Sequence, residues 1–443
     1  MSTLIGFKRV FFAAVAAMGF AAHGAWVVDT TAKTLVDEES GWGFTITIAN
    51  TTNITLTAIT SGEGDLDLRG LPDGYRLAGF GTIFKGSTTL ASFICEPTLE
   101  PMTTTAFYNC SALTNWVGGL APGKDLDEGH KDMFWNSKKL ASLTLTGVKY
   151  LPNYFCESCS GLKDAYLPDV TSINGSFSGC SALTNLVCNW AEMTQITGGF
   201  PTGMGGDLYL PKATTVGGFS GSKITSINVP KVKKLLGSAF NSCTSLTNFF
   251  GGLELETLES KDVFWNCPKL TGAITWPKLK VIHGNTFDST KVQSIDLSSL
   301  ETFSTAEANS KWLPISATNV ILGPVTAMPN GVLQNNSPAV PQQVHFLGPA
   351  VPTFAGKAFD NPDSKICRFF IHNREAIAGW TDACLQLKSQ GGDYGKYFYN
   401  AQGKRVCPNR TIGIVNATGH DPNGWGYAYA INATASGMSL LVR

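Results

Sequence analysis

The chain has 443 residues, of which only 15% are charged, with 33 Lys and Arg against 33 Asp and Glu. Hydrophobic residues make up 43% of it, so the chain can bury a large core and is not disordered as a whole. The even charge balance excludes a broad nucleic-acid surface, which needs clustered lysine and arginine. Length alone favours two or three domains, although a single repeat array fits equally well.

The first 25 residues have the pattern of a secretory signal peptide. Lys8 and Arg9 precede an apolar run over 10–22, and small residues then place the cleavage after Gly24 or Ala25. The run is shorter than the roughly 20 apolar residues that cross a membrane, and no later stretch is long enough. We therefore expect an exported protein, secreted or at the cell surface with the periplasm also open, and no transmembrane helix in the mature chain.

Residues 26–61 are rich in threonine and alternate in polarity, as in WGFTITIANTTNITLTAIT (42–60). Alternation with a period of two is typical of half-buried strands. We expect two or three antiparallel strands here, which form an N-terminal cap and lead to a first repeat strand at 66–68.

The motif Phe-x-x-Cys-x-x-Leu recurs along the middle of the chain. Full or looser copies begin at positions 84, 107, 134, 156, 177, 219, 240, 264 and 287. Their spacings are 23, 27, 22, 21, 42, 21, 24 and 23 residues, and the gap of 42 holds two units with a degenerate copy near Phe200. Such a fixed period predicts a repeat architecture.

Each unit continues with a short alternating segment, such as Leu143–Leu145 or Ile295–Leu297, and then a second extended segment that often begins with proline. One unit is therefore a strand, a corner, a second extended segment and another corner. Such a unit cannot bury its apolar side alone, so the copies must stack. The sequence predicts a mainly β repeat solenoid with about 21–24 residues per coil.

The repeats resemble the BspA-like leucine-rich repeat family of exported bacterial surface proteins. The resemblance rests on AFYNCSALTN (106–115), SFSGCSALTNL (176–186), AFNSCTSLTNF (239–249) and VFWNCPKLTG (263–272). It implies a leucine-rich repeat solenoid over 62–372 and a secreted or cell-surface protein that binds host or microbial partners.

Beyond Phe303 the pattern is reduced to strands at 320–322, 344–346 and 366–371, and a helix is expected over 374–388. A strand followed by a helix that contains Trp380 is similar to the closing cap of this family, and terminal repeats are usually atypical. We assign 373–443 to this cap helix and a small β-rich tail.

The cysteines at the repeat position are Cys110, Cys159, Cys180, Cys243 and Cys267. A small buried side chain at a tight corner explains them without reactivity. Disulfides between stacked pairs such as Cys159 and Cys180, or Cys243 and Cys267, remain open in an exported protein, as does one among Cys367, Cys384 and Cys407. The pair Cys156 and Cys159 is spaced like a redox or half-zinc motif, but both lie on repeat positions and no second such pair exists.

Motifs for chemistry are few. The acidic stretch 125–132 lacks the ligand spacing of a calcium loop and is interpreted as a solvated insertion. Histidines are scattered, and neither His-Glu-x-x-His nor Gly-x-Ser-x-Gly occurs. We therefore expect no catalytic residue, metal or cofactor. The alternative is an exported glycan-acting enzyme, for which Asp393, Asp421 and His420 are the candidate acids and histidine in the C-terminal segment.

Alternation along each strand places one row of side chains away from the core, which we call the outer row. Its predicted members are Ile94, Val117, Thr144, Tyr166, Val187, Tyr209, Asn228, Phe250, Ile274, Asp296, Ile321 and His345. An exposed apolar strip of this length marks an interaction surface, although β-branched and aromatic residues also simply suit strands.

The favoured function is a non-enzymatic binding protein that presents this sheet face to a protein or glycan ligand, in adhesion or host–microbe interaction. A purely structural surface component is the second alternative beside the enzyme. Neither the ligand nor the means of surface attachment can be derived from the sequence.

Overall fold

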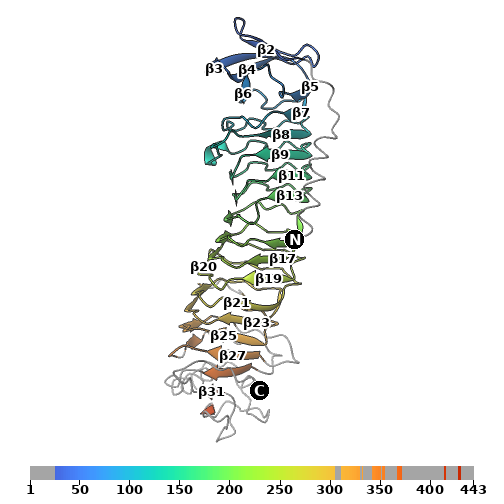
Figure 1. The fold of residues 1–443 in the computed structure, drawn as a ribbon. Helices are drawn as coiled ribbons and strands as arrows, with labels where there is room; N and C mark the ends of the chain where they lie inside the picture. The colour runs from blue at the N-terminus through green and yellow to red at the C-terminus, as the bar shows by residue number, and fades with distance from the viewer. Residues whose placement is uncertain are drawn as a thin grey trace, which may run out of the picture.

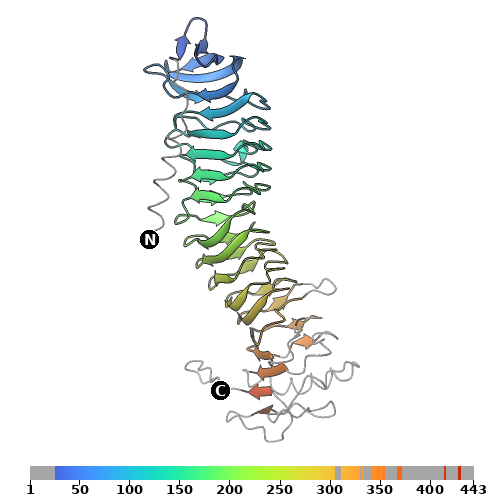
Figure 2. The same ribbon diagram turned by 90° about the vertical axis from the view of Figure 1, so that its right-hand side faces the viewer.

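The computed structural model describes residues 25–304, 311–329, 332, 342–350, 352–354, 367–371, 414–415 and 428–430. They form a long stack of coils in which each turn of chain lies on the one before it (Figure 1). In the view turned by 90°, the axis of the stack is bent and not straight (Figure 2). The predicted mainly β repeat solenoid is confirmed.

The main sheet of the solenoid is built from parallel strands and is divided into three blocks. The first block contains β5 (Gly64–Asp67), β7 (Leu90–Ile94), β8 (Asn115–Gly119), β9 (Ser142–Thr146), β11 (Asp164–Leu167) and β13 (Asn185–Cys188). The second contains β15 (Gly205–Tyr209), β17 (Lys223–Val229) and β19 (Asn248–Gly251). The third contains β21 (Thr271–Thr275), β23 (Lys291–Leu297), β25 (Asn319–Leu322), β27 (Gln342–Phe346), β29 (Cys367–Ile371), β31 (Ala428–Ala430) and β30 (Ile414–Val415). Strands of consecutive coils therefore pair in parallel within a block, and a register shift occurs in the first strand pair of each block.

A second column of two-residue strands runs along another side of the coils. It contains β10 (Tyr150–Leu151), β12 (Ser172–Ile173), β14 (Gln195–Ile196), β16 (Thr215–Val216), β18 (Lys234–Leu235) and β20 (Thr257–Leu258). It continues in the pairs β22 (Val281–Ile282) with β24 (Thr302–Phe303) and β26 (Ala327–Met328) with β28 (Thr353–Phe354). These are the second extended segments of the repeat, and in the two-residue strands from β10 to β26 the last residue is a buried apolar side chain.

The core is a ladder of phenylalanines that come from the first position of each motif. Phe84, Phe107 and Phe134 are fully buried and stack with ring centroids 5.4–5.5 Å apart. Phe240 and Phe264 repeat this arrangement at 5.3 Å. Most coils contribute one such ring, and Cys156 takes the position in one coil. Each coil thus covers the apolar side of its neighbour and buries apolar surface that no single repeat could bury.

The corner after each phenylalanine depends on a left-handed backbone conformation two positions later. Asn109, Asn136 and Asn266 have φ of 57–58° there, and serine or glycine takes the same position in other coils. Asparagine and glycine are the residues that adopt this conformation at low cost. This turn conformation explains why the second x position of the motif is asparagine, serine or glycine.

The open end of the solenoid is covered by an N-terminal sheet. It contains β1 (Val27–Asp29), β2 (Thr34–Val36), β3 (Gly43–Ala49) and β4 (Asn53–Ser61), which are antiparallel, and β6 (Arg76–Gly79), which joins β4 in parallel. The predicted antiparallel strands are therefore present. The boundaries at 61/62 and 372/373 remain predictions, and β6 shows that chain beyond residue 61 also contributes to this sheet.

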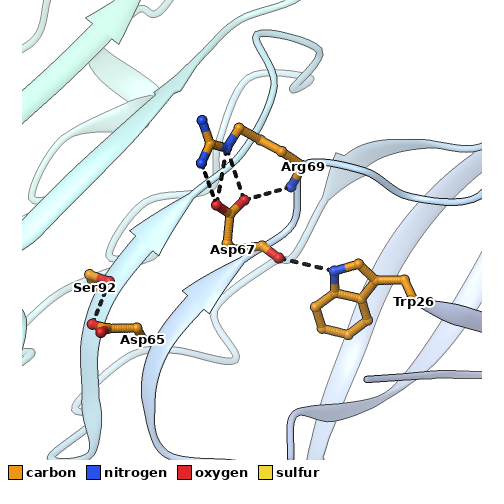
Figure 3. A network of polar contacts seen from close by, with 5 residues as sticks. All are labelled: Trp26, Asp65, Asp67, Arg69 and Ser92. Carbon is orange, nitrogen blue, oxygen red and sulfur yellow. Dashed lines mark hydrogen bonds and ion pairs between the residues drawn. The ribbon is translucent and has the colours of Figure 1, made fainter. Parts of the chain in front are cut away.

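Two indole groups join this sheet to the first strand of the solenoid. Trp42 Nε1 donates to the carbonyl oxygen of Asp65 at 2.9 Å. Figure 3 shows the second bond, in which Trp26 Nε1 donates to the carbonyl oxygen of Asp67 at 3.0 Å. Both carbonyls belong to β5, the edge strand of the main sheet. Edge strands expose unpaired carbonyl groups. The two indole N–H groups therefore provide hydrogen-bond donors to two carbonyls of this edge strand.

Candidate functional site

Within each block of the main sheet, the side chains of the outer row lie next to one another on neighbouring strands. The register joins Asp67, Ile94, Val117, Thr144, Tyr166 and Val187 in the first block. It joins Tyr209, Asn228 and Phe250 in the second block. It joins Thr275, Asp296, Ile321 and His345 in the third. The row is therefore interrupted at the two places where the main sheet is divided.

The two most exposed members of the outer row lie in the short middle block, one on each of its edge strands. Tyr209 is 57% exposed and Phe250 is 53% exposed, whereas Asn228 between them is half-buried. Tyr209 belongs to β15 and Phe250 to β19, the two edge strands of this block. Tyr166, Val117, Val187 and Ile321 are half-buried.

Ile94 lies in the outer row by register, but its prediction as an exposed residue is wrong. Its side chain is only 3% exposed. Its row neighbour Asp67 and its strand neighbour Ser92 are also buried, at 9% and 4%. The first strands of the main sheet are thus buried on both sides, and alternation no longer separates core from surface there.

Ile274 is wrongly placed in the outer row. It is 2% exposed and pairs with the core residue Ile295, while Thr275 pairs with Asp296 and takes the row position. Phe250 follows Leu246 by four residues, whereas Thr275 follows Leu270 by five. The added residue is accommodated around Gly272, which has φ of +81° and lies next to a shift of register. A bulge of this kind moves the later side chains to the opposite face.

A second, polar column runs beside the outer row and is missing from the sequence-based site. Its members lie two residues before those of the row: Asp65, Ser92, Asn115, Ser142, Asp164 and Asn185, then Asp207, Ser226 and Asn248. Ser92 Oγ donates to Asp65 Oδ1 at 2.7 Å, and Asn185 Nδ2 donates to Asp164 Oδ1 at 3.1 Å. Counting back two positions along each strand would have revealed it. The outer face therefore combines a hydrogen-bonding column with a partly aromatic one.

The five repeat cysteines lie in the core, each 0–1% exposed, as free thiols. Each thiol donates to the carbonyl oxygen at the phenylalanine position of the preceding coil, at 2.9–3.0 Å. Ser137 stands at the same repeat position, and its hydroxyl donates to Phe107 O at 2.8 Å. A serine can replace cysteine here because the position needs a small donor that ties one corner to the next.

Burial makes these thiols weak acids. It raises the pKa of Cys110 and of Cys243 from the ordinary 9.0 to about 11, and the pKa values of Cys180 and Cys267 rise as well. Between pH 9 and 11 the unfolded chain therefore loses thiol protons that the folded chain retains. Stability is complete below pH 9 and falls as the pH rises toward 11, by about 1.4 kcal/mol per pH unit for each such thiol.

This pH dependence can be measured by urea unfolding at pH 8, 9.5 and 10.5. Lysines and tyrosines also titrate in this range, so the control is the double variant Cys110→Ala/Cys243→Ala. We expect the variant to lose stability less steeply than the original chain. Parallel loss in both proteins would show that the two thiols do not carry the effect.

The acidic insertion is mostly exposed, as predicted, but it is attached to the following coil. The short 3-10 helix η1 (Glu128–His130) lies within it. Asp125 Oδ1 accepts from the backbone N–H groups of Lys149 and Tyr150 at 3.0 and 3.2 Å. Asn174 Nδ2 donates to Glu128 Oε1 at 2.6 Å. These carboxylates therefore attach the insertion to the coils that follow it by hydrogen bonds.

Within the described parts of the chain, no group of three or more His, Cys, Asp or Glu side chains is arranged to hold a metal ion. The same residues include no helix long and apolar enough to span a bilayer. Several predictions lie outside the described residues. They are residues 1–24 of the predicted signal peptide (1–25), the cap helix over 374–388, the side chain of Cys367, and Cys384, Cys407, Asp393, Asp421 and His420.

Comparisons with known proteins agree with the repeat. The family model "BspA type Leucine rich repeat region" matches residues 81–197 and 215–313 in six copies. A comparison with curated proteins finds no match.

Three solved structures are similar in fold. A leucine-rich repeat protein from Bacteroides ovatus is 14% identical over 74% of this chain and 98% of its own, with a TM-score of 0.33. The pneumococcal vaccine antigen PcpA is 10% identical over 80% and 95%, with a TM-score of 0.35. A leucine-rich cell surface protein from Faecalibacterium prausnitzii is 15% identical over 65% and 97%, with a TM-score of 0.28. Over residues 81–197 and 215–313, the chain carries six repeats of the BspA-type leucine-rich repeat family.

Proposed function

We propose that this chain is an exported, non-enzymatic binding protein that uses the outer face of its main sheet to attach to a protein or glycan at a surface, in adhesion or host–microbe interaction. The observation that carries the proposal is the exposure of Tyr209 and Phe250, at 57% and 53%, on a face formed by in-register strands. The match of its repeats to the BspA-type leucine-rich repeat family supports it.

Large apolar rings that remain in water cost free energy, which a partner can recover by covering them. Complete burial of such a side chain stabilises a protein by about 1.5–3 kcal/mol, so two rings held half in solvent leave that gain available to a partner. Aromatic residues are enriched among the side chains that dominate binding energies. The in-register strands also hold the face in shape before a partner arrives, which reduces the entropic cost of binding.

The test measures retention of the chain on immobilised extracellular-matrix and mucus extracts. The variant carries Tyr166→Ala, Tyr209→Ala and Phe250→Ser, all of which lie in the outer row. We expect at least a tenfold loss of retention, because each anchor of this kind contributes about 1 kcal/mol or more. Circular dichroism must show an unchanged fold, since none of the three side chains lies in the buried core.

Equal retention of the folded variant and the original chain would reject the proposal. No retention of either protein would instead favour a structural component without a ligand. An enzyme remains the other alternative, and it would need a pair of carboxylates or a nucleophile with its base near Asp393, Asp421 and His420. No observation on the described residues favours that alternative.

A further inference from the structure

The middle block of the main sheet presents two aromatic rings at a fixed separation. Tyr209 is in register with Asn228, and Asn228 is in register with Phe250. Adjacent strands lie about 4.8 Å apart, so the two rings stand about 9.6 Å apart along the axis of the solenoid. We call Tyr209, Asn228 and Phe250 the aromatic patch.

The surroundings of the aromatic patch are rich in hydroxyl and amide groups. The polar column beside it contributes Asp207, Ser226 and Asn248. Asp207 Oδ1 already accepts from Thr225 Oγ1 at 2.7 Å, and Asn248 Nδ2 donates to Thr247 Oγ1 at 2.9 Å. These groups form a hydrogen-bonding strip that lies directly next to the rings.

Charge is balanced on this part of the face. The three strands β15, β17 and β19 carry one carboxylate, Asp207, and one ammonium, Lys223. Electrostatic complementarity selects partners of opposite potential, and a face with no excess of either sign offers none to a polyanion or a basic protein. Its chemistry suits an uncharged ligand that has apolar faces and many hydroxyl groups.

We propose that the aromatic patch binds a neutral glycan chain, which lies along the solenoid axis and across the strands. Two sugar rings stack on Tyr209 and Phe250, and the sugar between them meets the amide of Asn228. The spacing of the two rings suits alternate sugars of an extended chain, because every second sugar of such a chain presents the same face. The polar column receives the hydroxyl groups at the side. This proposal rests on the proposed function and names the ligand class for the same face.

Titration calorimetry with defined oligosaccharides tests it. The neutral ligands are the hexasaccharides of β-1,4-linked glucose and of β-1,4-linked N-acetylglucosamine, with the corresponding disaccharides for length. A heparin hexasaccharide serves as the charged probe. We expect binding of a neutral hexasaccharide, and at least tenfold weaker binding of its disaccharide, because a disaccharide cannot reach both rings.

Two single variants locate the site. Tyr209→Ala and Phe250→Ala should each weaken hexasaccharide binding about tenfold, the effect of losing roughly 1.4 kcal/mol of contact. Trp265→Ala is the matched control, since Trp265 is also an exposed ring, at 38%, but lies at a corner of the coil and outside the patch. We expect it to bind as the original chain does.

The outcomes separate this proposal from the one on which it rests. If neither neutral hexasaccharide binds, or if the heparin probe binds more tightly, the glycan proposal is overturned, while retention on extracts that is lost in the triple variant would leave the proposed function standing. If hexasaccharide binding survives both single variants, the glycan binds elsewhere and the patch is not its site. If retention and glycan binding are both absent, both proposals fall.

Discussion

Replacing Phe134 by alanine is expected to destabilise the folded chain by about 3–5 kcal/mol, the range for removing a buried phenylalanine. Phe134 is fully buried and contacts three rings, with centroids 5.4 Å from Phe107, 5.4 Å from Trp116 and 5.3 Å from Phe155. The cavity would lie between coils, so the loss affects the contact on which the stack depends. Urea unfolding followed by circular dichroism measures it.

The matched control for this variant is Phe250→Ala, which removes the same atoms from an exposed site. Because Phe250 is 53% exposed, its removal should change stability by no more than about 0.5 kcal/mol. Repeat arrays can unfold in parts, so the transition must also be followed by tryptophan fluorescence. A loss below 1 kcal/mol for Phe134→Ala would mean that the phenylalanine ladder is not what holds the coils together.

Replacing Trp42 by alanine is expected to cost about 3–5 kcal/mol and to promote self-association. Trp42 is 1% exposed and lies parallel to Phe44 at a centroid distance of 5.7 Å. Its loss also frees the Asp65 carbonyl on the edge strand β5. An uncovered strand edge can pair with another chain, which light scattering at increasing protein concentration detects.

The variant Trp42→Phe separates packing from hydrogen bonding at this site. It retains an aromatic ring but removes the indole N–H, and a carbonyl left without its donor costs about 1–3 kcal/mol. Val27→Ala is the control, because Val27 belongs to the same sheet and is 58% exposed. A Trp42→Phe protein as stable as the original chain would refute the role of the indole hydrogen bond.

Much of the fold can be predicted from the sequence because the same residue pattern recurs in each coil. Phenylalanine, cysteine and leucine recur at a fixed spacing, and each occupies the core in coil after coil. Repetition averages out the ambiguity of any single short strand, so the strands at 143–145 and 295–297 could be located correctly. The same signal explains the low charge of the chain, since each coil uses most of its positions for core and corner.

Details that do not follow the repeat escape this averaging. The added residue at Gly272 shifts Ile274 into the core. The repeat length of about 21–24 residues does not predict such a bulge. The burial of Ile94 arises at the end of the stack, where strands are covered on both sides. The indole bonds from Trp26 and Trp42 to β5 join parts of the chain separated by 41 and 23 residues. These are tertiary contacts, and a local pattern does not encode them.

The candidate site was partly predictable for the same reasons. Alternation correctly selected Tyr209 and Phe250 as outward-facing residues. It could not rank them above Tyr166 or Val187, because the exposure of each side chain depends on its neighbours in three dimensions, which a local pattern does not encode. The polar column was within reach of the same counting, since each member precedes a row residue by two positions.

The most direct test of the outer face as a binding surface is retention of the chain on matrix and mucus extracts, compared with the variant that carries Tyr166→Ala, Tyr209→Ala and Phe250→Ser. We predict at least a tenfold loss of retention with an unchanged circular dichroism spectrum. Undiminished retention of the correctly folded variant would contradict the assignment of this face.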